Sequence, residues 1–204
     1  MTAAELRATL MQPTATGACV SLVGVCIAEP VDLAGVTVAS VDLSGAVFQA
    51  PVSFARACFS GLSWFKAAKF QANATFDGAV FANDARFDEA LMVKEASFTS
   101  AVFHGVAGFD RATFEGLCNF SRATAFGNAS FSGATFDAAA VFRDAECLGG
   151  LWLEGAHFNG RVEFDGIDVH GRTWLRNARL CEQNAITSAD KLARMMTSFG
   201  YQWL

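Results

Sequence analysis

Phenylalanine recurs at a fixed spacing through the middle of this chain, and this spacing constrains the fold more than any other feature. The gaps alternate between five and six residues, so the period is eleven. A small residue usually lies two places earlier, as in Ala79 before Phe81 and Ala85 before Phe87. The series consists of Phe48, Phe54, Phe59, Phe65, Phe70, Phe76, Phe81, Phe87, Phe98, Phe103, Phe109, Phe114 and Phe120, with Met92 in its one gap.

A unit of five or six residues is too short for a helical turn and a loop, but it suits a short extended segment followed by a turn. Inward positions separated by one residue follow the two-residue period of a β-strand. Gly, Asn, Asp and Ser, which tolerate the dihedral angles of corners, occupy the turn positions. No unit can bury its Phe alone, so the units must stack. Aliphatic centres extend the array towards the N-terminus at Leu22, Ile27, Leu33, Val38 and Leu43.

Residues 31–35 (VDLAG) and 41–45 (VDLSG) resemble the unit of the pentapeptide-repeat proteins, which reads A(D/N)Lxx or A(D/N)Fxx. The resemblance covers most of the chain and implies an all-β solenoid, a right-handed quadrilateral β-helix with four units per coil. Units of five and six residues in alternation give 22 residues per coil, and the array then makes about seven coils. We expect an N-terminal cap at 1–17, the β-helix at 18–184, and a C-terminal helix and tail at 185–204.

Both ends of the array need a cover, because a terminal coil has no neighbour. A short helix is expected over residues 3–11, ending before Pro13. A second helix is expected to start near Thr187 or Ser188 and to run to about Phe199, with Gly200 ending it. This helix and its apolar tail either cap the last coil or form a homodimer surface, as in gyrase-binding members of the family. The residues concerned are Leu192, Met195, Met196, Phe199 and Trp203.

The uncharged stretch at residues 8–28 raises the question of a membrane segment. Its Gln, Pro, Thr and Gly residues make a poor spanning helix, and Glu5 is unsuited to a secretory signal. The spacing of Leu22 and Ile27 instead predicts the first rungs of the array. Six cysteines without metal-ligand spacing are expected to be reduced thiols, with Cys118 and Cys147 pointing inward. We therefore expect a cytoplasmic protein without membrane contact, metal or cofactor.

The ladder breaks on one face. Large residues are expected at positions 125, 147 and 169, but the chain has Ala125, Cys147 and Val169, which recur at the coil period. Large groups follow two of them, at Phe126 and Leu148. Either this face has slipped by one residue, so that the large groups point inward, or the centres stay inside and the large groups stand outside. In the second case the wall is expected to sink inward, because a void the size of three rings is costly.

Outward side chains that are one coil period apart should stack in columns, and several apolar ones then gather near positions 124–176. An exposed apolar cluster with charges at its edge marks a contact surface, and Trp is a frequent anchor in such surfaces. The expected binding patch comprises His104, Phe126, Leu148, Trp152, Trp174 and Arg172.

The same region offers the one arrangement that could support catalysis. Glu146 and Asp168 should lie one rung apart, which favours a raised pKa for one carboxyl, and His170 is two residues beyond Asp168. The alternative interpretation is that these charges only solvate the surface. His104 and His170 lie too far apart to share a metal ion. An enzyme or small-molecule-binding protein that uses Trp152 and Trp174 therefore stands as the alternative to a non-catalytic one.

The family resemblance also raises DNA mimicry, because several members bind type II topoisomerases through an acidic rod and confer quinolone resistance. A net charge of −5 argues against direct nucleic-acid binding. Asp88, Asp110 and Glu154 share a column, but Lys66 and Arg176 bracket them. We expect a non-catalytic protein-interaction module, with a gyrase binder linked to quinolone or toxin resistance as its sharpest form. A rigid structural scaffold is a further alternative.

Overall fold

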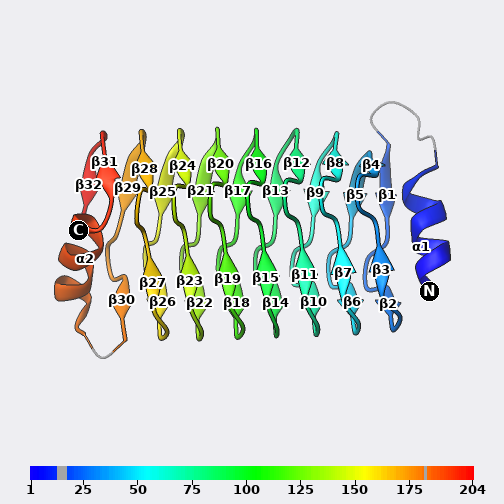
Figure 1. Ribbon diagram of the computed structural model, residues 1–204, viewed down its shortest axis with the longest axis horizontal. Coiled ribbons are helices and arrows are strands. Elements are labelled where there is room, and N and C mark those ends of the chain that lie inside the picture. Colours follow the sequence, from blue (N-terminus) through cyan, green and yellow to red (C-terminus); the bar gives the residue numbers. More distant parts are fainter. Residues whose placement is uncertain (13–17, 182) are drawn as a thin grey trace.

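Four parallel β-sheets form the sides of a solenoid whose coils stack along one axis (Figure 1). The computed structural model describes residues 1–12, 18–181 and 183–204. Pro13, predicted to follow the first helix, lies outside the described residues. Each coil contributes one short strand to each sheet, so strands that are neighbours in a sheet come from successive coils.

The four sheets, here named A to D, follow one another around each coil. Sheet A contains β1 (Cys19–Ser21), β5 (Ser40–Asp42), β9 (Ser63–Trp64), β13 (Ala85–Arg86), β17 (Ala107–Gly108), β21 (Asn128–Ser130), β25 (Gly150–Trp152), β29 (Arg172–Trp174) and β32 (Gln202–Trp203). Sheet B contains β2 (Cys26–Ile27), β6 (Val47–Phe48), β10 (Lys69–Phe70), β14 (Leu91–Met92), β18 (Thr113–Phe114), β22 (Thr135–Phe136), β26 (His157–Phe158) and β30 (Arg179–Leu180).

The other two sheets close the square. Sheet C contains β3 (Val31–Asp32), β7 (Val52–Ser53), β11 (Ala74–Thr75), β15 (Ala96–Ser97), β19 (Cys118–Asn119), β23 (Ala140–Val141) and β27 (Val162–Glu163). Sheet D contains β4 (Thr37–Val38), β8 (Cys58–Phe59), β12 (Val80–Phe81), β16 (Val102–Phe103), β20 (Thr124–Ala125), β24 (Glu146–Cys147), β28 (Asp168–Val169) and β31 (Thr197–Ser198).

The strand register confirms the predicted coil length. Lys69 pairs with Leu91, the position that the alternation of five and six places one full coil further along the chain. In the first coil the step is one residue shorter, as in the pairing of Val31 with Val52, because the aliphatic units there are shorter. The first rungs predicted from Leu22 and Ile27 are present as β1 and β2.

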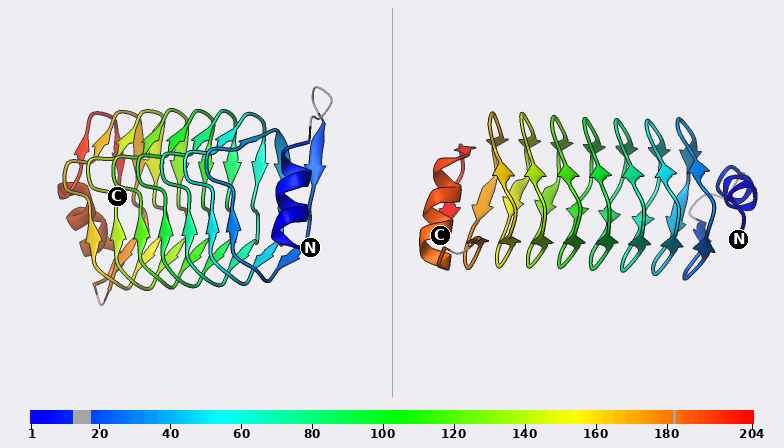
Figure 2. Two further views of the ribbon diagram at one scale, coloured as in Figure 1. Left: turned by 45° about the vertical axis from the view of Figure 1, so that its right-hand side comes forward. Right: turned by 60° about the horizontal axis from the view of Figure 1, so that its bottom comes forward.

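Phenylalanine rings fill the interior in columns that run along the axis. Phe76 stacks on Phe98 with centroids 4.8 Å apart and planes 1° from parallel. Rings on neighbouring faces meet edge to face, as Phe76 and Phe87 do at 84°. Both geometries are favourable for aromatic pairs. The interior is therefore a continuous packed core with a helix at each end (Figure 2).

The two helices close the ends of this core. Helix α1 (Ala3–Leu10) starts at a capping box, in which the Thr2 and Glu5 side chains bond each other's backbone N–H, and it buries Leu6 and Leu10. Helix α2 (Ala185–Arg194) is capped by Asn184, and its Leu192 is fully buried. None of the helices in the described part of the chain is long and apolar enough to cross a membrane.

The C-terminal segment differs from the prediction in two ways. Helix α2 begins before Thr187 and ends at Arg194, well before Phe199. Ser188 does not cap it, because its Oγ accepts a hydrogen bond from the backbone N–H of Leu180 at 2.8 Å. The residues after the helix form β31 and β32, which extend sheets D and A by one more strand each. The open edges of β28 and β29 offer backbone hydrogen bonds that a longer helix would have left unused.

Candidate interaction surface

The corner between sheets D and A carries a column of side chains that stand outside the solenoid. We call it the corner column, and it consists of His104, Phe126, Leu148, His170 and Phe199. Backbone bonds fix its register: Phe126 N–H donates to the Phe103 carbonyl, and Leu148 N–H donates to the Ala125 carbonyl, both at 2.8 Å. The rings of His104 and Phe126 stack with centroids 5.0 Å apart. The corner column is therefore a packed row.

A glycine follows each member of the corner column, and the close packing of the coils requires it. A Cβ added at Gly127 would collide with the carbonyl oxygen of Gly105, and one at Gly149 would collide with the backbone of Gly127. The same holds at Gly171 and Gly200. Successive coils approach so closely at this corner that only glycine fits, which places the preceding side chains one above the other.

Behind the corner column, the small centres remain inside. Ala125, Cys147 and Val169 are all buried, whereas Phe126 is 48% exposed. The interpretation in which the face slips by one residue is therefore wrong. The strands keep their register across the break, since Phe103 pairs with Ala125 and Ala125 pairs with Cys147.

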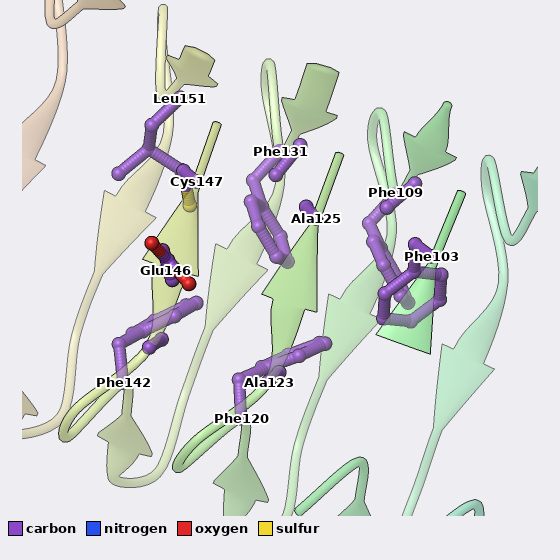
Figure 3. Close-up of a pocket in the computed structure, with 13 residues that line it drawn as sticks. Phe103, Phe109, Phe120, Ala123, Ala125, Phe131, Phe142, Glu146, Cys147 and Leu151 are labelled. Atoms are coloured by element: carbon purple, nitrogen blue, oxygen red, sulfur yellow. The ribbon is translucent and has the colours of Figure 1, made fainter. Parts of the chain in front are cut away.

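A small pocket remains where the rings are missing, and Figure 3 shows the side chains that line it. Leu151 is buried at the position where the preceding coils have Ala107 and Ala129, and it lies beside Cys147. The pocket that remains has a volume of about 20 Å³ and an almost wholly apolar lining. That is room for about one water molecule, and an apolar lining offers it no partners. The wall behind the corner column is therefore closely packed.

A second column lies on the outer surface of sheet A. We call it the tryptophan column, and it comprises Trp152, Trp174 and Trp203, which pair in register. Trp174 stacks on Trp203 at 5.0 Å and 8°, and it meets Trp152 edge to face at 6.4 Å and 73°. The sequence places Trp203 in an apolar tail beyond the array. Its separation from Trp174 along the chain exceeds one coil period, because α2 is inserted between the two rungs, and this insertion conceals the register.

The charged candidates of the predicted catalytic group lie at the edge of the corner column. Glu146 and Asp168 occupy adjacent rungs. His170 pairs with Glu146 rather than with Asp168, and its Nε2 lies 3.3 Å from Glu146 Oε1. Arg172 lies between the two columns, in register with Gly150. No cluster of three or more metal-ligating side chains occurs in the described ranges of the chain.

The residues predicted as a cap or dimer surface separate into two groups. Leu192 and Met196 are buried, and Met195 is half-buried against the core. Phe199 and Trp203 are instead the last members of the corner column and the tryptophan column. At the same end, Ile186 on α2 is 80% exposed, and Tyr201 and Leu204 are also exposed.

Carboxylates on the sides of the solenoid are bracketed by basic residues. Glu89 lies 3.7 Å from Lys66 and 2.8 Å from Arg111, and these cations hold the pKa of the Glu89 carboxyl below its usual range. Glu163 is bracketed in the same way by Arg143 and Arg161. At these two positions the acidic side chains are therefore interrupted by basic ones.

A comparison with known proteins identifies a repeat family. The family model described as pentapeptide repeats matches residues 43–91, 98–146 and 131–179, which is more than half of the chain. No curated protein matches the sequence. Among solved structures, the chain is similar to HetL, a pentapeptide repeat protein involved in heterocyst differentiation regulation from the cyanobacterium Nostoc sp. Strain PCC 7120. The identity is 13%, the match covers 89% of this chain and 86% of HetL, and the TM-score is 0.33.

Stacked coils of this kind present long, rigid side faces, which serve as protein-interaction or structural modules. Three findings support the same family assignment: the match of the repeat model, the regular strand register and the four parallel sheets. This chain belongs to the pentapeptide-repeat family.

Proposed function

We propose that this protein is a non-catalytic interaction module that binds a protein partner through the corner column and the tryptophan column. The observation that supports this is the gathering of large exposed apolar side chains there. Phe126, Trp152, Phe199 and Trp203 are 48%, 37%, 65% and 50% exposed. Contiguous exposed apolar groups with charges at their edge are typical of protein-binding surfaces, and Trp is enriched among binding hot spots.

The rigidity of this surface supports the same function. The glycines that follow the corner column, here called the glycine stack, let successive coils pack closely at this corner, and the small pocket behind Ala125 leaves no space for Phe126 to turn inward. The apolar groups are therefore held outside before a partner arrives. A preformed surface loses little conformational entropy on binding.

The test is affinity capture from extracts of the source cells with three forms of the protein. The first is the native chain, and the second carries Phe126→Ser and Trp152→Ser. The third carries Trp64→Ser and Leu117→Ser, two exposed apolar residues outside the two columns. We expect the native and third forms to capture similar amounts of the same partner. The second form should capture at least about tenfold less, which corresponds to a loss of about 1.4 kcal/mol in binding free energy. Equal capture by all three folded forms would contradict the proposal.

A narrower form of the proposal is that the partner is a type II topoisomerase, recognised by DNA mimicry. The net charge of −5 and the rod-like shape favour it. The pairing of Glu89 and Glu163 with basic side chains weighs against it, because a duplex mimic needs continuous negative charge. A gyrase supercoiling assay decides the matter: neither inhibition nor quinolone protection at micromolar protein would remove this form of the proposal and leave the interaction surface in place.

We also propose a homodimer through the C-terminal end. Ile186 on α2 is 80% exposed, and it lines a groove of about 280 Å³ together with Ala185, Ala189, Leu204, Arg176 and Asn177. Sedimentation of the native chain and of an Ile186→Asp variant tests this. A dimer that becomes a monomer on substitution is the expected result, and a native monomer at tens of micromolar would contradict it.

A further inference from the structure

A groove on sheet A combines aromatic rings with an unpaired carboxylate. It lies on the side of the tryptophan column away from the corner, has a volume of about 210 Å³, and is lined by Ser132, Trp152, Glu154 and Trp174. The planes of the two indole rings meet at 73°, so one ring forms a wall beside the other. Ser132 lies one rung before Glu154, and its N–H bonds the Asp110 carboxylate.

The electrostatics of the groove favour a cation. Within the described residues, Glu154 makes no ion pair, not even with Arg176, which lies one coil further on. Asp110 lies one coil before Ser132 and outside the lining of the groove, and its carboxylate already accepts hydrogen bonds from Ser130 and Ser132. The basic groups on neighbouring rungs are Arg172 and Arg176 in the next coil, both exposed, and Arg111 near Gly133, which pairs with Glu89 at 2.8 Å. A ligand in the groove would therefore meet the Glu154 carboxylate, which has no ion-pair partner among the described residues, and two indole rings.

We propose that this groove binds an arginine side chain of the protein partner, so the inference rests on the proposed function and names one contact of it. A guanidinium is planar and weakly hydrated, and it stacks on indole faces while its N–H groups pair with a carboxylate. Lysine lacks the flat surface needed for stacking. The groove thus supplies the stacking surface in Trp152 and the counter-charge in Glu154, with Ser132 Oγ as a further acceptor.

The isolated chain suffices for the test, because the probes are N-acetyl-arginine amide and its neutral isostere N-acetyl-citrulline amide. The readout is the indole N–H signals of Trp152 and Trp174 in proton–nitrogen NMR spectra. Trp64 serves as an internal control, because it belongs to the same face of sheet A but lies outside the groove. We expect saturable shifts of the two groove signals with the arginine probe, at millimolar affinity, and no shift of Trp64.

The charge and the shape requirements are tested separately. Glu154→Gln should weaken arginine binding about threefold to tenfold, as should replacement of arginine by citrulline. Glu115→Gln, at another exposed carboxylate, should change nothing. Equal affinity for arginine and citrulline, equal affinity for N-acetyl-lysine amide, or unchanged binding by the Glu154→Gln protein would overturn the proposal. These results need no partner, so they stay distinct from the capture experiment on Phe126 and Trp152.

Discussion

The imidazole of His170 lies against the phenyl ring of Phe199, with centroids 5.0 Å apart and planes 23° from parallel. Helix α2 separates the two residues in the sequence, yet the N–H of Phe199 bonds the carbonyl of Val169 at 2.9 Å. After the helix, the chain thus returns to the solenoid and adds a rung. Phe199 is therefore a member of the corner column, and Trp203 is a member of the tryptophan column.

Replacing Phe199 by Ala should loosen this last rung. The aromatic contact contributes about 0.5–1.5 kcal/mol beyond burial. Its loss should detach β31, and with it Trp203, whose ring covers Trp174. We expect faster amide hydrogen exchange at positions 197 and 199 and a red shift of tryptophan emission. Phe126→Ala is the control, because it lies in the same column but in a continuous coil. Unchanged exchange in β31 would contradict the role of the ring contact.

The small pocket beneath Ala125 predicts opposite effects for two substitutions at that residue. Ala125→Val adds two carbons beside a void of about 20 Å³ and should stabilise the fold or leave it unchanged, since each buried methylene is worth about 0.8 kcal/mol. Ala125→Phe restores the regular spacing of Phe in the sequence, but a phenyl ring is much larger than the void. We expect this substitution to lower the free energy of unfolding by about 1–3 kcal/mol. Urea unfolding measures both. A stabilising Ala125→Phe would show that this wall is not closely packed.

Thiol reactivity should divide the cysteines into two groups. Burial raises the pKa of the Cys147 thiol to about 12 and that of Cys118 well above its usual value. Below pH 9 both remain protonated, and the thiolate is the reactive form. Iodoacetamide should therefore modify exposed Cys26 and Cys181 in the native protein at pH 8 and reach Cys118 and Cys147 only after unfolding. Mass spectrometry of tryptic peptides checks this, and early labelling of Cys147 would contradict the packed wall.

The glycine stack at the corner predicts that two Gly→Ala variants differ in severity. At Gly127 the new methyl would collide with the Gly105 backbone, which cannot move aside like a flexible side chain, so we expect a loss of about 3 kcal/mol or more. At Gly24 nothing lies within 4 Å, and only the positive φ of 68° opposes a side chain. That strain costs about 1–2 kcal/mol. Thermal unfolding compares the two, and an equal or smaller loss at Gly127 would argue against close approach of the coils.

The fold was predictable because every coil repeats the same physical problem. Each Phe must be buried by neighbours, and the alternation of five and six residues allows only a short strand and a turn. The break at Ala125, Cys147 and Val169 was visible in the sequence because it interrupts this repeat. Which side chains point inward at the break depends on packing, which the sequence does not give. Leu151 fills space beside Cys147, and a larger residue at an inward position is unremarkable in a sequence.

The C-terminal segment was harder to predict. Leu192, Met195, Met196 and Phe199 have helical spacing, and that local signal suggested a helix through all four. The edges of β28 and β29 are created only by tertiary structure, and they draw the chain back into strands after Met195. Because the chain returns to a strand, Trp203 lies in register with Trp174 in the tryptophan column. The groove beside Glu154 was missed because it depends on the ring orientations of Trp152 and Trp174.

The coil period is constant after the first coil, and this makes the length of the molecule adjustable without changing its cross-section. Removal of residues 72–93 would join positions that are equivalent in successive coils, as the pairing of Lys69 with Leu91 shows. Every sheet would lose one strand, and every remaining side chain would keep its face. The distance from the N-terminal helix to the corner column would shorten by one rung, about 4.8 Å. In evolution, gain or loss of a coil would therefore move the corner column and the tryptophan column along the rod in fixed steps, while the residues of the two columns stay the same.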